Sequence, residues 1–400
     1  MDPGEEGPGL RAGSAPLGDP VAIVGAGQTT HRSRRLDVSA PELIDEAVQA
    51  ALRDARLEPD GIDAVVVGNM EHFEGIHLSD LWAVEGTGGA GKPQLKVATG
   101  GTTGSSLAQA AYYLVASGFF RTVMAVGWER LSDSEGETTS GIVTAFDPIY
   151  ERPTLAGAVS GLAIMACQYQ TRYGTRAEDT ALVVVQAREN AVRNPHAHLR
   201  KPVTVAEVLA SPVLSTPIRY LDMCPTSDGA CAVVFSSRPG AGRVVWVRGV
   251  SSRHNHTYIG DVTEGSVSYT HTLRLAAEDA YRQAGIADPR RELDVVEMYE
   301  PCTWAAFEWS EALGLCGPGE AARMWAEGAT RRDGDIPVNP SGGVLCTNPI
   351  GATGLIRVAE ASMQVRGTAG ERQVDGARLA LATGFGGSFW SEVMVLGAER

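Results

Sequence analysis

The fold is decided by the stretch SAPELIDEAVQAALRDARL (39–57) and the stretch IDAVVVG (62–68) that follows it after a short Pro/Gly turn. The first stretch opens with a serine and a glutamate three residues later, a capping box, with a proline near the helix start. Apolar residues then recur every three or four positions, which predicts an amphipathic helix. The second stretch is a continuous apolar run, which predicts a buried strand.

The same order of elements recurs in the second half of the chain. HTLRLAAEDAYRQAGI (271–286) predicts another amphipathic helix, and a Pro-containing turn leads from it into the strand LDVVEM (293–298). A second element repeats as well: Thr103-Gly104 and Thr353-Gly354 each begin a helix, and each helix is followed by a strand. These helices are predicted to end near 118 and 367, and their strands to cover 122–126 and 378–382. An internal repeat therefore organises the chain.

The repeat predicts an α/β fold in which a β-α-β-α-β unit is duplicated, with first strands at 21–24 and 244–250. Strands that alternate with helices indicate mainly parallel sheets. We expect five layers, α-β-α-β-α, with small residues where the inner helices cross. The segment from about 129 to 220 is predicted to be a lid region inserted in the first half, with a helix at 178–192 and a closing strand at 232–236. The predicted organisation is a flexible tail (1–19), an N-terminal half (20–240) and a C-terminal half (241–400).

Composition excludes several classes of protein. The 400 residues include 47 glycines, only 20% are charged, and 34 basic against 48 acidic residues give a net charge of −14. A nucleic-acid-binding protein needs a basic face, so this balance argues against one. The chain has no apolar run long enough for a membrane span and no pattern typical of a secretory signal. The sequence predicts a cytoplasmic globular protein.

The six cysteines lie at positions 167, 224, 231, 302, 316 and 346, and none forms a C-x-x-C pair. In a cytoplasmic chain they are expected to be reduced, and their spacing does not suggest zinc. The default interpretation of each thiol is a small buried apolar residue. The glycine turn at Val24-Gly25-Ala26-Gly27 lacks the full G-x-G-x-x-G pattern, which argues against a dinucleotide site.

Four segments together resemble the thiolase family, and within it the sterol-carrier-protein-type branch. The similarity covers about residues 20–398. It agrees with the duplicated fold that the repeat predicts independently. The segments are Gly101-Thr102-Thr103-Gly104-Ser105, Cys224-Pro225-Thr226-Ser227-Asp228-Gly229-Ala230, Asp294-Val295-Val296-Glu297-Met298-Tyr299-Glu300, and Asn339-Pro340-Ser341-Gly342-Gly343 followed by Asn348-Pro349-Ile350-Gly351-Ala352-Thr353-Gly354.

The departures from the family pattern bear on the chemistry. A thiolase forms an acyl-enzyme and needs an activated thiolate. By the resemblance, Gly101 stands at the nucleophile position and Gly384 at the position of the second cysteine. Asn348 and Tyr299 stand where the family has histidines. Cys346 and Cys302 lie close in sequence to these positions and are the candidates for a substitute nucleophile, although neither has a histidine beside it.

The pattern is closest in kind to the thiolase-like aldolases of actinobacterial steroid side-chain degradation. The resemblance implies a lyase that cleaves a β-hydroxyacyl-CoA into a ketone or aldehyde and a shortened acyl-CoA, with a tyrosine in place of the cysteine. Tyr299 is then the predicted proton acceptor, Asn348 the oxyanion donor, and His254 or His256 a possible relay. A further active-site tyrosine of those aldolases has no counterpart in the motifs. Substrate contacts are predicted for Gly101, Thr103, Gly343 and Gly386.

Two other functions stay open. One is an acyl-CoA acyltransferase or condensing enzyme with a relocated cysteine, and the other is a non-catalytic thiolase-like subunit or a carrier of acyl-CoA or lipid. The resemblance implies a CoA thioester as substrate, no cofactor or metal, a homodimer, and a possible partner built from a zinc ribbon and an OB-like barrel. Clustered basic residues for a CoA phosphate are sparse, the candidates being Arg188, Arg200 and Lys201.

Overall fold

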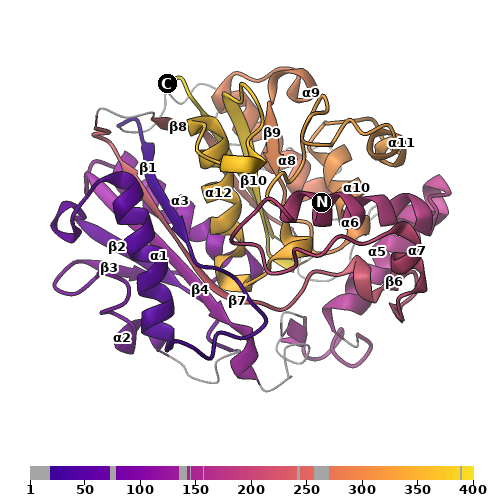
Figure 1. Ribbon diagram of the computed structural model, residues 1–400, viewed down its shortest axis with the longest axis horizontal. Helices are drawn as coiled ribbons and strands as arrows, with labels where there is room; N and C mark the ends of the chain where they lie inside the picture. The colour runs from indigo at the N-terminus through magenta and orange to yellow at the C-terminus, as the bar shows by residue number, and fades with distance from the viewer. Residues whose placement is uncertain are drawn as a thin grey trace, which may run out of the picture.

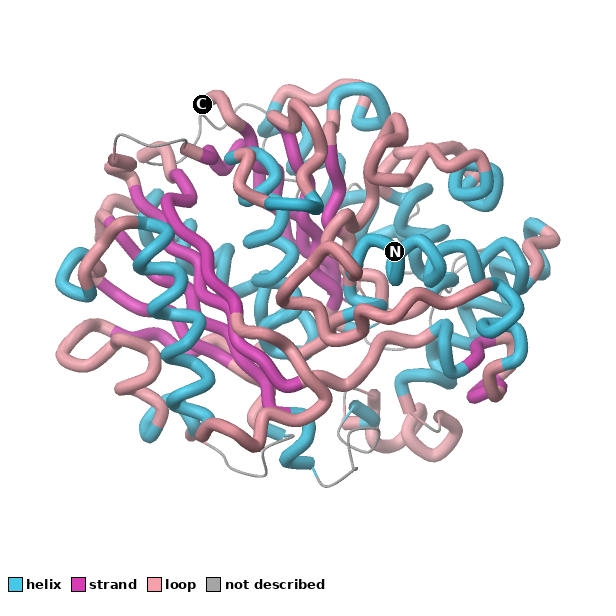
Figure 2. Tube along the Cα trace, viewed as in Figure 1, coloured by secondary structure: helices cyan, strands magenta, loops and turns pink. Residues whose placement is uncertain are grey.

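The computed structural model describes residues 19–72, 78–134, 142–144, 146–155, 157–240, 244–255, 270–387 and 390–400. The predicted tail, apart from residue 19, and His256 therefore lie outside the described residues. Nine strands form one sheet in the order β3-β2-β4-β7-β1-β8-β11-β10-β9, flanked by helices on both faces (Figures 1 and 2).

The first repeat contributes the β3 to β1 side of this sheet. Its long helix α1 begins with the predicted capping box, in which Ser39 and Glu42 cap each other's backbone N–H groups. The elements are β1 (Ala22–Gln28), α1 (Ala40–Ala55), β2 (Ala64–Gly68), α2 (Ser79–Trp82), β3 (Gln94–Lys96), α3 (Thr103–Ala116), β4 (Thr122–Arg130) and β7 (Asp228–Ser236).

The second repeat contributes the β8 to β9 side and follows the same order. The sequence prediction placed its two main helices correctly but did not identify α10 or the last strand, β11. The elements are β8 (Val245–His254), α8 (Thr270–Ala284), α9 (Pro289–Glu292), β9 (Val295–Glu297), α10 (Thr303–Ala312), α11 (Ala321–Ala326), α12 (Ile350–Arg366), β10 (Leu379–Phe385) and β11 (Trp390–Gly397).

Alternate residues of the strands face different layers, as the period of a strand requires. In β4, Val123 and Ala125 pack toward α3 and α12, whereas Met124, Val126 and Trp128 pack toward α1. Helix α12 contacts strands of both halves, and α8 covers β8 and β11. The expected five-layer arrangement is therefore confirmed, with α3 and α12 in the middle layer.

The inner helices cross at the glycines of the repeated Thr-Gly pair. A methyl group on Gly104 would lie 2.6 Å from the backbone nitrogen of Leu355, and one on Gly354 would lie 2.5 Å from that of Ser105. Only glycine permits this approach of two backbones. The prediction of small residues at the inner crossing is confirmed.

The expectation of mainly parallel sheets is wrong. Parallel pairs join β2 to β3, β2 to β4 and β9 to β10, whereas the other five pairings are antiparallel. The strands after each βαβα segment, β7 and β11, return antiparallel to their neighbours, which alternation alone does not reveal. Short pairing of β1 with β8 also joins the two expected sheets into one.

The predicted lid region lies between β4 and β7, and its predicted central helix is α6. It reaches across to the second half, where α6 contacts α10, α11 and the one-turn helix Val344–Cys346. The lid therefore brings residues from the first half to the loops that follow the second-half strands (Figure 1). Its elements are α5 (Ala158–Tyr173), α6 (Ala177–Ala191), α7 (Val205–Ala210), β5 (Val213–Ser215) and β6 (Ile218–Arg219).

Candidate active site

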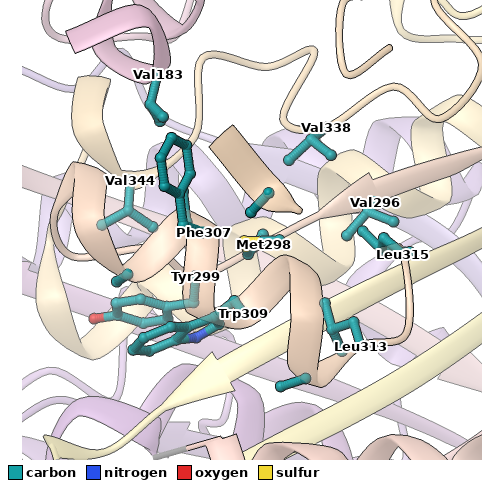
Figure 3. Close-up of a cluster of buried hydrophobic side chains, with 14 of the residues drawn as sticks. Val183, Val296, Met298, Tyr299, Phe307, Trp309, Leu313, Leu315, Val338 and Val344 are labelled. Carbon is teal, nitrogen blue, oxygen red and sulfur yellow. The ribbon is translucent and has the colours of Figure 1, made fainter. Parts of the chain in front are cut away.

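Tyr299 follows β9 and lies 97% buried at the edge of the largest apolar cluster, beside Trp309 (Figure 3). Its backbone N–H donates to the Thr383 hydroxyl at 2.8 Å, which fixes the residue against β10. The phenol donates to Asn348 Oδ1 at 3.5 Å. Burial raises the pKa of the Tyr299 phenol well above its ordinary value, and the neighbouring Cys224 raises it further.

Asn348 precedes α12, and both its backbone and its side chain are fixed by hydrogen bonds. Its backbone N–H donates to Ser227 Oγ at 3.1 Å, and its Oδ1 accepts from Thr353 Oγ1 at 2.9 Å as well as from Tyr299. One N–H of its amide nitrogen donates to Cys224 Sγ at 3.2 Å. Because the amide carries two N–H groups, a second donor is available to a ligand. The sequence-predicted pair of Tyr299 and Asn348 is brought together.

Cys224 is a site residue that the sequence did not identify as a candidate nucleophile. It is half-buried and contacts Asn348, whereas the two thiols proposed from the sequence, Cys302 and Cys346, are almost fully buried. Burial raises the pKa of Cys224 and of Cys346 to about 12 each, and raises that of Cys302 as well. Membership of Cys224 in the quoted family segment was the signal that could have identified it.

Neither glycine at a family cysteine position leaves room for a side chain. A methyl group on Gly101 would meet the Phe385 carbonyl oxygen at 2.5 Å, and one on Gly384 would meet Ser105 Oγ at 1.9 Å. Gly386 lies in the same contact, beside Thr102 and Trp390. The predicted substrate residues Gly101 and Gly386 are therefore neighbours. The hydroxyl of Thr103 instead donates to the Gly100 carbonyl and supports the turn.

Gly343 has a positive φ of +64°, in the left-handed backbone region. A methyl group there would contact the carboxylate of Glu300 and the amide of Asn339. Asn339 donates to Glu300 at 2.5 Å, and burial raises the pKa of this carboxyl group to about 8. When Glu300 is ionised, its charge adds to the effect of burial on the pKa of Cys224 and Cys346 and further disfavours thiolates at both positions.

His254 is not brought to this constellation by any contact of the described residues. It is exposed at the end of β8, its ring packs at a tilt against Trp390, and it hydrogen-bonds the Asn255 carbonyl. A different histidine lies close to Asn348. His198 of the lid region shares Ser227 Oγ at 3.0 Å with the Asn348 backbone N–H. Burial lowers the pKa of His198, which favours the neutral imidazole.

Within the described ranges, no group of three or more His, Cys, Asp or Glu side chains has an arrangement that could hold a metal ion. No helix of the described part is both long and apolar enough to cross a bilayer. The side chains that meet at the candidate site are the Tyr299 phenol, the Asn348 amide, the Cys224 thiol and, through Ser227, the His198 imidazole.

Comparisons with known proteins agree with this architecture. Family models match residues 21–239 as the thiolase N-terminal domain and residues 251–398 as the thiolase C-terminal domain-like family. An acetyl-CoA acetyltransferase from Methanothermobacter thermautotrophicus is 34% identical, over 92% of this chain and 96% of its own length. Sterol carrier protein 2 from Gallus gallus is 30% identical, over 92% of this chain and 69% of its own.

Among solved structures, the Ltp2-ChsH2(DUF35) aldolase is similar with a TM-score of 0.82 and 26% identity, covering 96% of this chain and all of its counterpart. A duplicated, helix-covered sheet with its site where the two halves meet defines a protein of the thiolase-like α/β class. The chain belongs to the thiolase family. Enzymes of this family act on CoA thioesters without a metal or other cofactor.

Proposed function

We propose that this protein is a carbon–carbon lyase that cleaves a β-hydroxyacyl-CoA by a retro-aldol reaction, without an acyl-enzyme. The observation that carries the proposal is the steric closure at Gly101, where a cysteine Cβ would collide with the Phe385 carbonyl. A thiolase nucleophile has no place there. The similarity to a solved aldolase supports the same interpretation.

The site residues have defined roles in this reaction. Ionised Tyr299 accepts the proton of the substrate β-hydroxyl, and the Cα–Cβ bond breaks as the β-carbon becomes a carbonyl. The bond electrons pass to the thioester as an enolate, whose oxygen accepts a hydrogen bond from the free N–H of Asn348. Return of that proton from the Tyr299 phenol to Cα then gives the shortened acyl-CoA and restores the ionised tyrosine.

The rate of cleavage should rise with pH throughout the neutral range. Burial raises the pKa of Tyr299 above its usual value of about 10, so the ionised fraction is small and grows about tenfold per pH unit. A plot of kcat/KM between pH 6 and 9 measures this dependence. A plateau below pH 8 would contradict the role of Tyr299 and indicate a group such as His198 or Glu300 as the base.

Cysteine substitution separates the lyase from an acyl-transfer enzyme. Alkylation would give an ambiguous answer, because Cys224 lies beside Asn348 and a bulky adduct there would block the site. We expect Cys224→Ser and Cys346→Ser each to retain lyase turnover within a few-fold of the unmodified enzyme. Loss of turnover in either variant, or a stable acyl adduct in the intact mass after incubation with acyl-CoA, would refute the proposal.

The second candidate function is acyl transfer or condensation through a relocated cysteine. The half-buried thiol of Cys224, with an amide donor at 3.2 Å, is the observation that favours it, together with similarity to acetyl-CoA acetyltransferases. The raised pKa of this thiol argues against it, because only the thiolate attacks. A non-catalytic carrier function is compatible with the similarity to sterol carrier protein 2.

Assembly and location also belong to the proposal. Strand β3 lies at an edge of the sheet, and its Leu95 is about half exposed. We expect this edge to pair with that of a second copy in a homodimer, which light scattering would measure. We propose that this protein also binds a small acyl-CoA-binding partner, because the solved aldolase contains ChsH2(DUF35) beside Ltp2.

We further propose that the protein is located in the cytoplasm and acts in lipid or steroid degradation.

A further inference from the structure

One buried arginine differs from all the others in the described part of the chain. Six arginines there are less than 9% exposed, and five of them form an ion pair with a carboxylate. Arg188 on α6 forms none. The paired residues are Arg35 with Glu46, Arg130 with Asp133, Arg357 with Glu297, Arg366 with Asp54, and Arg372 with Glu360.

The guanidinium of Arg188 also forms few hydrogen bonds with neutral groups. Its side chain is 93% buried, its Nε has no hydrogen-bond partner, and its Nη1 donates only to the Lys201 carbonyl at 3.4 Å. Burying a guanidinium without a counter-charge is unfavourable, because the group loses its hydration and gains no ionic partner. Such a residue is expected to gain an anionic partner when the protein is occupied.

The position of Arg188 connects it with the candidate active site. Its Nη1 donates to the carbonyl of Lys201, three residues after His198, and α6 contacts the one-turn helix that ends at Cys346. Leu199 N–H donates to the Cys346 carbonyl at 3.0 Å, and His198 shares Ser227 Oγ with the backbone N–H of Asn348. A continuous series of contacts therefore joins Arg188 to the segment that carries the Asn348 amide, which we propose binds the thioester oxygen.

Arg200 and Lys201, the other two basic residues identified in the lid sequence, are exposed. They suit a solvated phosphate better than Arg188 does. In a CoA thioester, the long pantetheine arm separates the phosphates from the reacting carbonyl. An anion close to Asn348 is therefore expected on the acyl group, and a guanidinium matches a carboxylate in charge and in planar geometry.

We propose that Arg188 binds a free carboxylate on the acyl chain, so that the substrates are CoA monothioesters of dicarboxylic acids. This inference rests on the proposed function only in taking an acyl-CoA as the ligand. It concerns binding and not turnover, so it can fail while the lyase reaction is correct, or hold while the reaction differs.

Calorimetric titration of the whole protein tests the inference. The probes are succinyl-, glutaryl- and adipyl-CoA, compared with butyryl-, valeryl- and hexanoyl-CoA of equal chain length. We expect at least one carboxylated probe to bind about tenfold or more tighter than its counterpart. Arg188→Gln should abolish the difference without weakening the uncharged thioesters, and Arg188→Lys should retain part of it.

The controls distinguish the remaining outcomes. Arg193→Gln removes an exposed arginine just beyond the end of α6 and should leave every affinity unchanged. If Arg188→Gln weakens charged and uncharged thioesters equally, Arg188 binds a CoA phosphate and the inference is wrong. Equal binding of all matched pairs by the unsubstituted protein would also overturn it. Thermal unfolding of Arg188→Gln and Arg188→Lys establishes that the compared proteins are folded.

Discussion

Replacing Tyr299 by phenylalanine should lower lyase turnover by about a hundredfold to ten-thousandfold, the range expected when a positioned acid–base group is lost. The hydroxyl makes one long hydrogen bond, to Asn348 at 3.5 Å, so its removal should leave folding nearly unchanged. The effect is measured as the rate at which the carbonyl product is released from a β-hydroxyacyl-CoA. Turnover within a few-fold of the original enzyme would remove Tyr299 from the mechanism.

Tyr281 provides a matched control for this substitution. It is a buried tyrosine of the same half, and its hydroxyl donates to the Leu313 carbonyl at 2.9 Å, away from the site residues. Tyr281→Phe leaves that carbonyl without its partner and should lower the free energy of unfolding by about 1–2 kcal/mol. It should not change turnover. The two variants together separate loss of chemistry from loss of stability.

Replacing Asn348 by alanine should lower turnover by about a hundredfold, the usual cost of one oxyanion donor. The loss should appear in kcat more than in KM, because the enolate oxygen carries its negative charge only as the carbon–carbon bond breaks. Steady-state kinetics with saturating substrate measure both constants. An unchanged kcat would exclude the oxyanion role.

Thr353→Val tests whether the orientation of the Asn348 amide matters in itself. The Thr353 hydroxyl donates to Asn348 Oδ1 at 2.9 Å and therefore fixes which end of the amide faces the ligand. Valine retains the shape of the side chain and removes this donor. We expect a smaller loss of kcat than in Asn348→Ala, and the same value in the two variants would contradict a positioning role.

Much of the fold could be predicted because the chain repeats its signals. The capping box at Ser39 and the paired helix starts at Thr103 and Thr353 are local, and the structure has helices at all of them. Strand direction could not be predicted. The short connection between β10 and β11 permits only an antiparallel pair, but β11 itself was not predicted. The direction of β7 depends on the long lid region that precedes it.

The site residues that belong to a sequence motif could be predicted, whereas those placed by tertiary packing could not. Tyr299 and Asn348 lie together as the resemblance implied. His198 was missed because only the fold brings the lid to Ser227, about 30 residues further along the chain. His254 was chosen for its residue type, but the end of β8 carries it to the surface. The closed space at Gly384 follows from Ser105, which no pattern around residue 384 reveals.

The position of α12 between the two halves has a consequence for how the protein can be divided. Every residue of α12 is buried, and one apolar cluster combines its side chains with strands β1, β4 and β7 of the other repeat. Although the sequence contains two copies of the unit, neither copy forms a complete hydrophobic core by itself. Cutting the chain at the junction near residue 240 would leave the first copy with a broad apolar face in water. The chain thus contains two similar copies but folds as one unit of stability.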